Sequence, residues 1–368
     1  MTEISTRADD DGNVSFPGKI AVITTALSQK LEDFHSAEQL VAKYGADKVI
    51  HLAWPVFINE ENKQASAIVS TLAEDMEIKA LIINQAMPGT NSAVKKLREI
   101  RDDIFTVFCT IHESYAVTTK CANLLFEPDE VGMGPAMVKQ SKKQGARAFI
   151  HYSFPRHMSQ PLLSHRRDLI RKTCEAEGIQ FIDASAPDPT VADGLDIARK
   201  FILEDVPRLV ARYGEDTAFF TTNCGLQMAL IKAVVDCHAI YPQPCCPSPY
   251  HGFPEALGIQ TGEGLYNLNS LISEISSIAA EKNMTDRLST WPVSASMMFT
   301  NAGAEYAIKW IRGEVPRNRI DDRALEDCMN SYIREVVGEG VEVAMTSYSE
   351  GGIPCDNFKL LLMSYLDF

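Results

Sequence analysis

The sequence predicts an α/β protein built from two parallel-sheet lobes, and three observations support this. Short β-branched runs alternate with amphipathic helical stretches from Lys19 to Cys109. The same alternation restarts near Asn123 with segments of similar size. A chain of 368 residues is also long for one simple core and suits two lobes of roughly 120–180 residues each.

The first lobe begins with Lys19–Thr25, which is short, apolar and β-branched, as buried strands are. Leu31–Tyr44 follows with an apolar stripe at helical spacing, and Gly45 provides its C-cap. Alternating strands and helices of this kind form right-handed crossovers and a parallel sheet covered by helices. The further strands predicted here are Lys48–Trp54, Lys79–Asn84 and Ile104–Cys109, and the further helices are Gln64–Met76 and Asn91–Asp102.

The second lobe is expected to open with the strand Asn123–Phe126 and the helix Val131–Lys143, which Gly145 ends. Pro207 is expected to split a long helical region, because proline lacks the helical N–H and clashes with the preceding turn. The other strands predicted are Arg147–Tyr152, Gln180–Asp183 and Thr217–Thr222, and the other helices are Pro161–Glu177, Leu195–Tyr213 and Leu226–Cys237.

A proline-rich segment, Cys245–Pro254, interrupts this order and is expected to carry the chain back to the first lobe. We therefore expect a disordered segment at 1–17, a first lobe of 18–120 with much of 251–368, and a second lobe of 121–250. The last part is predicted to hold helices at Leu268–Lys282, Ala302–Arg312 and Arg323–Val337, then strands at Val341–Tyr348 and Lys359–Asp367.

The composition of the chain indicates which partners and which cellular compartment to expect. The net charge of -14 and the pI near 5.1 argue against direct nucleic-acid binding, which needs clustered Lys and Arg. No apolar run approaches the roughly 20 residues needed to span a bilayer. Nine scattered cysteines without CxxC spacing fit free thiols in a reducing compartment, so we expect a cytoplasmic protein. The first 18 residues show no apolar signal region; export or lipid anchoring is the alternative if a signal segment has been removed.

One segment resembles a known superfamily at the level of residues. Glu127–Phe154 reads EPDEVGMGPAMVKQSKKQGARAFIHYSF, in which an acidic residue, a Gly and a helix lead into a strand with a polar loop. This resembles the type I periplasmic-binding-protein superfamily, which includes sugar-binding proteins and the ligand domains of lactose-repressor-type proteins. The resemblance covers most of residues 18–250 in element order and implies a ligand cleft between the lobes.

More narrowly, the run HYSFPRHMS from His151 to Ser159 resembles an uncharacterised bacterial family within that superfamily. Its members are labelled as proposed lipoproteins or proposed transcriptional regulators. The sequence has no helix-turn-helix before its first strand, which argues against a direct DNA-binding role even if the regulator label applies.

Ligands of parallel sheets bind beyond the carboxyl ends of the strands, so the loops after each strand supply the candidate residues. Their hydroxyls, amides, aromatic rings and one guanidinium suit a small polar ligand bearing hydroxyl or carboxylate groups. Residues of these types also cap helices and satisfy loop backbones, and that alternative applies to each of them. The candidates are Thr24, Thr25, Ser28, Asn84, Gln85, His112 and Glu113 in the first lobe, His151, Tyr152, Ser153, Arg156, His157, Asp183, Thr222 and Asn223 in the second, and Tyr250 at the expected return crossing.

No metal or cofactor is expected. His151 and His157 lie six residues apart with no third ligand at diagnostic spacing. Cys245 and Cys246 are adjacent, which opposes a shared disulfide, so they are interpreted as packing thiols. Gly132 and Gly134 open a helix as a dinucleotide fingerprint would, but Met137 stands at the third glycine position.

The predicted function is reversible binding of a small polar ligand with hinge closure, in solute capture for a transporter or in sensing. The first alternative is a cytoplasmic enzyme, with Cys224 beside His238 or His251, with His112 and Glu113, or with the His151–His157 loop. The second alternative is a ligand-responsive regulator that acts through a partner protein.

Overall fold

The computed structural model describes residues 16–26, 31–55, 63–260 and 267–368. The chain forms two compact α/β units, each with a parallel sheet, and this confirms the predicted fold class. Unit 1 comprises Met1–Pro128, Ala295–Glu335 and Val343–Leu361, and unit 2 comprises Asp129–Ser294, Val336–Glu342 and Leu362–Phe368.

The sheet of unit 1 has the strand order β10-β11-β5-β4-β3-β1-β2. Neighbours from β2 to β5 pair in parallel, and β11 pairs in parallel with β5. Gly351 and Gly352 join β10 to β11 with positive φ at both positions, as a two-residue hairpin turn requires. The strands are β1 (Lys19–Thr24), β2 (Val49–Ala53), β3 (Ile78–Ala86), β4 (Phe105–Ile111), β5 (Leu124–Pro128), β10 (Val343–Glu350) and β11 (Ile353–Met363).

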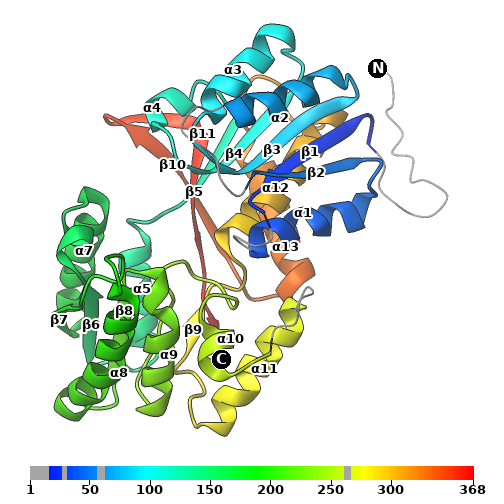
Figure 1. Ribbon diagram of the computed structural model, residues 1–368. Coiled ribbons are helices and arrows are strands. Elements are labelled where there is room, and N and C mark those ends of the chain that lie inside the picture. The colour runs from blue at the N-terminus through cyan, green and yellow to red at the C-terminus, as the bar shows by residue number, and fades with distance from the viewer. Residues whose placement is uncertain (1–15, 27–30, 56–62, 261–266) are drawn as a thin grey trace. The chain divides into compact units, whose positions relative to one another are not determined.

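Helices cover both faces of this sheet (Figure 1). The helices α2 (Lys63–Glu74) and α3 (Thr90–Ile100) lie on one face, and α1 (Leu31–Tyr44), α12 (Ala295–Arg312) and α13 (Asp322–Val337) lie on the other. The short α4 (Tyr115–Thr118) follows β4. Helix α12 approaches the sheet closely at Gly303, where an added Cβ would lie 2.9 Å from Val107 Cγ1 of β4.

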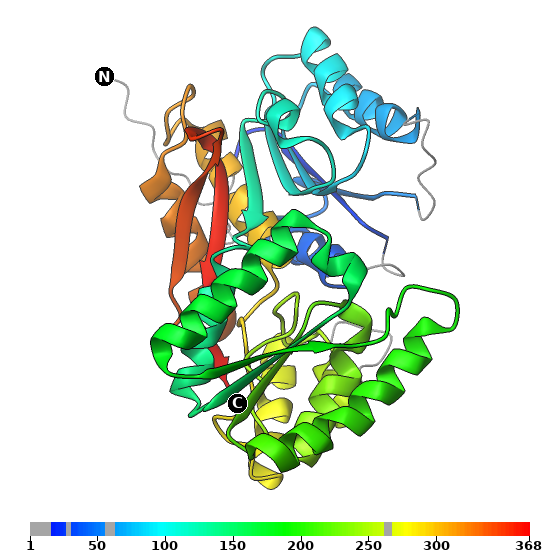
Figure 2. The ribbon, with the colours of Figure 1, turned by 90° about the vertical axis from the view of Figure 1, so that its left-hand side faces the viewer.

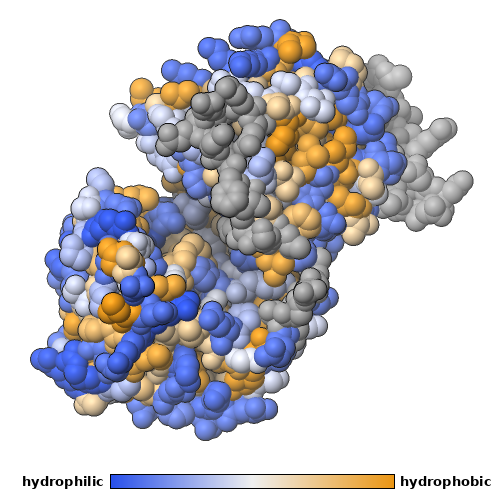
Figure 3. Space-filling model, in the orientation of Figure 1, coloured by the Kyte–Doolittle hydropathy of each residue, from blue (hydrophilic) through white to orange (hydrophobic). Residues whose placement is uncertain are grey.

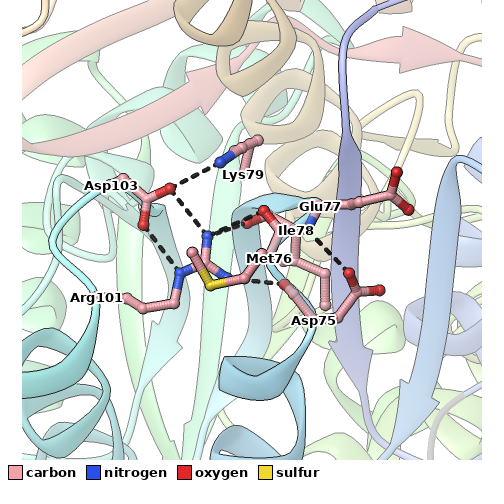
Figure 4. A network of polar contacts seen from close by, with 7 residues as sticks. All are labelled: Asp75, Met76, Glu77, Ile78, Lys79, Arg101 and Asp103. Carbon is pink, nitrogen blue, oxygen red and sulfur yellow. Dashed lines mark hydrogen bonds and ion pairs between the residues drawn. The ribbon is translucent and has the colours of Figure 1, made fainter.

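A buried guanidinium fixes the amino-terminal end of β3 (Figure 4). Arg101 is 4% exposed and donates to the backbone oxygens of Asp75 at 2.8 Å and Ile78 at 2.9 Å. It also donates to the backbone oxygen of Met76 at 3.4 Å and to both carboxylate oxygens of Asp103 at 2.9 Å each. Lys79 pairs with the same carboxylate at 2.8 Å, so one side chain joins the turn before β3 to the turn before β4.

The sheet of unit 2 has the parallel core β7-β6-β8, formed by β6 (Ala148–Ser153), β7 (Gln180–Ser185) and β8 (Thr217–Thr221). Parallel bridges from Ala218 to Ile240 and from Tyr241 to Leu288 extend it beyond β8. The short strands β9 (Ser289–Thr290) and β12 (Leu366–Asp367) then pair antiparallel. The C-terminal residues therefore complete the sheet edge of unit 2.

Helices also lie on both faces of the unit 2 sheet (Figures 1 and 2). Met137 and Ile170 of α5 and α7 pack with Phe149 and Phe220 on one face. Ile202 of α8 and Leu230 of α9 pack on the other. The elements are α5 (Met133–Lys143), α6 (Pro155–Met158), α7 (Pro161–Glu177), α8 (Gly194–Tyr213), the 3-10 turn η1 (Cys224–Leu226), α9 (Gln227–Asp236), α10 (Phe253–Leu257) and α11 (Leu268–Glu281).

The structure differs from the expected chain course in two places. Strand β5 pairs with β4 and β11 in unit 1, although we expected it to open the second lobe. Residues 247–254 lie within unit 2, and the chain passes to unit 1 after Ser294. The units therefore divide after Pro128 and after Ser294, where the sequence suggested boundaries after 120 and 250.

Helix α8 also runs through Pro207 without interruption. The lost hydrogen bond is the one to the carbonyl of Leu203, and both Pro207 and Leu203 lie on the exposed side of the helix. Because water can satisfy that carbonyl, the proline costs the helix less than it would on a buried side.

Among the described residues, no helix is long and apolar enough to cross a membrane. On the visible face of unit 2, apolar residues are interspersed with hydrophilic ones (Figure 3).

Candidate functional site

The carboxyl ends of β6 and β7 border a hollow in unit 2. Its volume is about 260 Å³. Ser153 and Ser185, the last residues of the two strands, lie side by side in the register of the sheet. Ser185 is exposed, and its hydroxyl makes no hydrogen bond with any described residue. The hollow is lined by Ser153, Phe154, Pro155, Met158, Asp183, Ala184 and Ser185.

Three polar side chains form a hydrogen-bonded group beside this hollow. The hydroxyl of Thr222, directly after β8, lies 2.9 Å from Ser153 Oγ and 2.9 Å from His157 Nδ1. The His157 ring packs on Phe154 with 4.1 Å between ring centroids. Burial lowers the pKa of His157, and Arg156 lowers it further, so the ring is neutral at pH 7. The group can therefore donate to and accept from a ligand without carrying a charge.

Two charged residues of the candidate set lie at the same end of the sheet. Asp183 accepts hydrogen bonds from His151 and Arg167, and these lower its pKa, so it is ionised at neutral pH. Arg156 is 56% exposed and pairs with Asp188 at 3.2 Å. Such an exposed pair contributes little to stability, about 0–1 kcal/mol. The guanidinium thus has a carboxylate partner from its own chain.

His151 and Tyr152 lie in the core, on opposite faces of β6. His151 is fully buried between Phe181 and Phe220, with Nδ1 3.1 Å from Asp183. Tyr152 is fully buried on the other face and donates to Asp205 at 2.8 Å. Both were candidates for ligand contact, but they belong to β6, and successive side chains of a strand point to opposite faces. Neither residue lines the hollow.

Unit 1 carries a second polar group, at the carboxyl ends of β1, β3 and β4. Gln85 donates through Nε2 to Asp33 at 3.0 Å, and its Oε1 lies 2.9 Å from His112 Nε2. Thr25 donates to the same Asp33 oxygen at 3.4 Å, and Trp54 donates to the Gln85 backbone oxygen at 3.0 Å. Three of the predicted residues, Thr25, Gln85 and His112, are therefore joined in one network.

The backbone is strained at this edge. Gln85 has φ 61 and Thr110 has φ 47, and each stands one residue before the end of its strand. The flanking pairs Asn84–Cys109 and Ala86–Ile111 place the two residues opposite each other. Left-handed non-glycine residues cost about 1–3 kcal/mol each and cluster at functional sites. The strain favours a binding role for this edge.

The remaining predicted residues have structural partners. The Glu113 carboxylate caps α3 by accepting from the N–H groups of Gly89 and Asn91. Asn84 donates to Thr300 of α12 at 2.7 Å, and Thr24 bonds His51 at 2.9 Å. In the second lobe, Asn223 caps the turn η1, and Tyr250 packs against the unit 2 core. Ser28 lies outside the described residues.

Two groups of polar residues in the structure do not follow from the sequence patterns. Asp33 is fully buried in the first turn of α1, and the only sequence signal for it is an acidic pair after the first strand. The thiols of Cys224, Cys245 and Cys246 come together with His251, whereas the sequence predicts that the adjacent Cys245 and Cys246 are packing thiols. His251 is thus the histidine near Cys224 in the described residues, and His238 is absent from this group.

Comparison with solved structures shows the fold. A protein from Clostridium difficile 630 proposed to be a transcriptional regulator aligns over 96% of this chain and all of its own, with a TM-score of 0.85 and 21% identity. The substrate-binding protein of a sugar ABC transport system from Bordetella parapertussis 12822 covers 95% of this chain and 89% of its own, with a TM-score of 0.51 and 11% identity. The expected type I periplasmic-binding-protein-like fold is confirmed.

Comparison of sequences shows the family. An uncharacterized protein of Treponema pallidum (strain Nichols) is 29% identical over 219 residues, which are 58% of this chain and 99% of the relative. A second from the same organism is 32% identical over 177 residues, 46% of this chain and 80% of the relative. Residues 18–289 match the family described as "Protein of unknown function (DUF3798)", and the chain belongs to that family.

Proposed function

We propose that this protein reversibly binds a small, uncharged, hydroxyl-bearing ligand at the carboxyl-end edge of the unit 2 sheet. The observation that carries this proposal is the hollow bordered by Ser153 and Ser185, with the Thr222–His157 pair beside it. Ligands of parallel α/β sheets bind at this edge, because the loops that follow the strands form a crevice there. The fold shared with a sugar-transport substrate-binding protein agrees with a ligand of this class.

The charges around the hollow favour a neutral ligand over an anion. Asp183 lines the hollow as a carboxylate, and it would repel a ligand carboxylate while accepting from a ligand hydroxyl. Arg156, the cation expected to anchor an anion, is already paired with Asp188. His157 is neutral and adds no positive charge. Hydroxyls of a sugar or polyol match these donors and acceptors.

The second polar edge, formed by Thr25, Asp33, Gln85 and His112 in unit 1, is a further candidate for ligand contact. We propose that both edges contribute to one ligand and that the units move when it binds. Small-angle X-ray scattering with and without saturating ligand tests this part, since closure lowers the radius of gyration.

A thermal-shift screen against sugars, polyols, nucleosides, amino acids and carboxylates identifies the ligand class. A ligand at about 100 times its Kd adds about 2.7 kcal/mol of stability, which such a screen resolves. We expect hits among sugars and polyols. Hits confined to carboxylates would contradict the proposal.

Two variants then test the site by calorimetric titration. Ser185→Ala removes an exposed hydroxyl with no partner among the described residues, so it should weaken binding about tenfold while leaving the melting temperature unchanged. Thr222→Val removes the hydroxyl that joins Ser153 and His157 and should weaken binding at least as much. Ser164→Ala, in α7 of the same unit, is the matched control, because among the described residues its hydroxyl bonds the local Pro161 carbonyl alone. Equal affinities in all three would refute the site.

The output of binding is either delivery to a transporter or a signal to a regulatory partner. Affinity capture from the native cell with and without ligand distinguishes them, since a permease in the captured set supports delivery and a regulatory protein supports sensing. Among the described residues the nine cysteines form no disulfide, which agrees with the cytoplasmic location that we propose.

A further inference from the structure

Three thiols and an imidazole converge at one point of unit 2. Cys224 begins the turn η1, which follows β8 after Thr222 and Asn223. Cys245 and Cys246 come from the proline-rich segment, and His251 lies just before α10. The sulfur of Cys224 lies 3.3 Å from that of Cys245 and 3.7 Å from that of Cys246. The adjacent sulfurs of Cys245 and Cys246 are 3.9 Å apart, and all four potential ligand atoms lie within 4.8 Å of one another.

These separations match a tetrahedral metal site. Zinc–thiolate bonds of about 2.3 Å place the sulfurs of a tetrahedral site about 3.8 Å apart. A disulfide needs about 2.05 Å between two sulfurs, and it would leave the third thiol and the imidazole without a role. We propose that Cys224, Cys245, Cys246 and His251 bind one zinc ion as a Cys3His site.

One hydrogen bond of the His251 imidazole is of a kind that metal-binding histidines make. Its Nδ1 lies 3.0 Å from the backbone oxygen of Cys246. A carbonyl oxygen can only accept, so Nδ1 carries the proton and Nε2 carries the lone pair. Histidines that bind metals commonly donate their other N–H to a backbone carbonyl in this way, which fixes the tautomer and the ring. The same hydrogen bond links two of the four ligands.

The site would hold the proline-rich segment in place. Four prolines between Pro242 and Pro249 remove backbone donors, so the segment has few ladder or helical hydrogen bonds available. A metal bound to Cys224 would join this segment to the carboxyl end of β8. It would also fix Tyr250, which lies between the ligands Cys246 and His251 and packs against the unit 2 core.

Four protein ligands leave no open coordination position, so the site is structural and supplies no catalytic water. Such a site also argues against Cys224 as the nucleophile of an enzyme. Its sulfur would be bound to the zinc beside the thiolates of Cys245 and Cys246, and it would not be available to attack a substrate. The inference is independent of ligand binding at the β6–β7 edge, and either can fail without the other.

Metal content is measured on the full chain purified under reducing conditions without added chelator. We expect one zinc per chain by elemental mass spectrometry. Replacing zinc with Co²⁺ should give the near-ultraviolet sulfur-to-cobalt absorption and the strong visible bands of a tetrahedral thiolate site. The cobalt spectrum reports ligand type and geometry on the unmodified protein, so it does not depend on any variant folding.

Two variants assign the ligands. Cys246→Ser and His251→Gln change residues that are exposed or half-buried, and each should lower zinc affinity at least about 100-fold. Cys237→Ser is the matched control, because this half-buried free thiol of unit 2 lies outside the group. It should retain one zinc and the wild-type cobalt spectrum. Chelation of zinc should lower the melting temperature of wild type and of Cys237→Ser, but not of the two ligand variants.

Three results would overturn the proposal. The first is wild-type protein that takes up neither zinc nor cobalt in stoichiometric amount. The second is metal retained with unchanged affinity in Cys246→Ser and His251→Gln. The third is a disulfide at this point. It would appear as a chain mass lower by two hydrogens and as proteolytic peptides joined through Cys224 and Cys245.

Discussion

Arg101→Met is the substitution that tests most directly how unit 1 is held together. Methionine keeps most of the buried stem of Arg101 but removes every donor of the guanidinium. The backbone oxygens of Asp75 and Ile78 then lose bonds of 2.8 and 2.9 Å, of which the first is partly buried and the second buried. Each acceptor left unsatisfied costs about 1–3 kcal/mol, and the half-exposed Asp103 pair adds about 1 kcal/mol or less. Together, the two acceptors and the pair give an expected loss of about 2–7 kcal/mol.

For a unit of this size, 1 kcal/mol corresponds to about 2–4 °C in melting temperature, so the transition of unit 1 should fall by at least about 4 °C. Differential scanning calorimetry is the assay, because it measures each unfolding transition and so identifies the one that the substitution shifts. Arg147→Met is the control: Arg147 is 85% exposed and its pair with Asp216 spans 3.5 Å, so the change should stay within about 0.5 kcal/mol. Equal shifts in the two variants would refute the reasoning.

Two further predictions concern pH and packing. Burial lowers the pKa of His151 in the folded protein. Below the unfolded pKa of about 6.5, the unfolded state therefore binds a proton that the folded state does not. The free energy of unfolding should fall as pH drops toward the lowered pKa, by up to about 1.4 kcal/mol per pH unit. His151→Phe should flatten the melting temperature of unit 2 between pH 7 and about 5, and an unchanged slope would contradict the assignment. Gly303→Ala should destabilise unit 1 by about 1–3 kcal/mol, because its Cβ meets Val107 at 2.9 Å. Adding Val107→Ala should restore part of that loss in a double-mutant cycle followed by urea unfolding, and strict additivity would show that the contact is not responsible.

Local sequence patterns predicted the existence and order of the early elements but not the sheet to which each strand belongs. The runs at Lys19–Thr24 and Ile78–Ala86 are apolar and β-branched, so their burial followed directly from composition. Strand β5 was recognised as a strand, but its pairing with β11 joins Leu125 to Phe358, more than two hundred residues later. Periodicity carries no information on partners so distant. For the same reason the prolines after Tyr241 indicated an extended segment but not the unit that contains it.

The candidate site was also predicted only as far as local sequence patterns allow. Parallel strands end at one edge, so the loops after β6, β7 and β8 had to meet, and Ser153, Asp183 and Thr222 do lie at that edge. The direction of each side chain depends on the pleat, and this is why His151 entered the core. The thiol group could not be anticipated, because Cys224 reaches Cys245 only once the proline-rich segment folds back over the end of β8. Spacing rules detect metal sites whose ligands are close in sequence. A site assembled from the end of one strand and a segment about twenty residues later has no such signature, so its geometry has to be found in the folded chain.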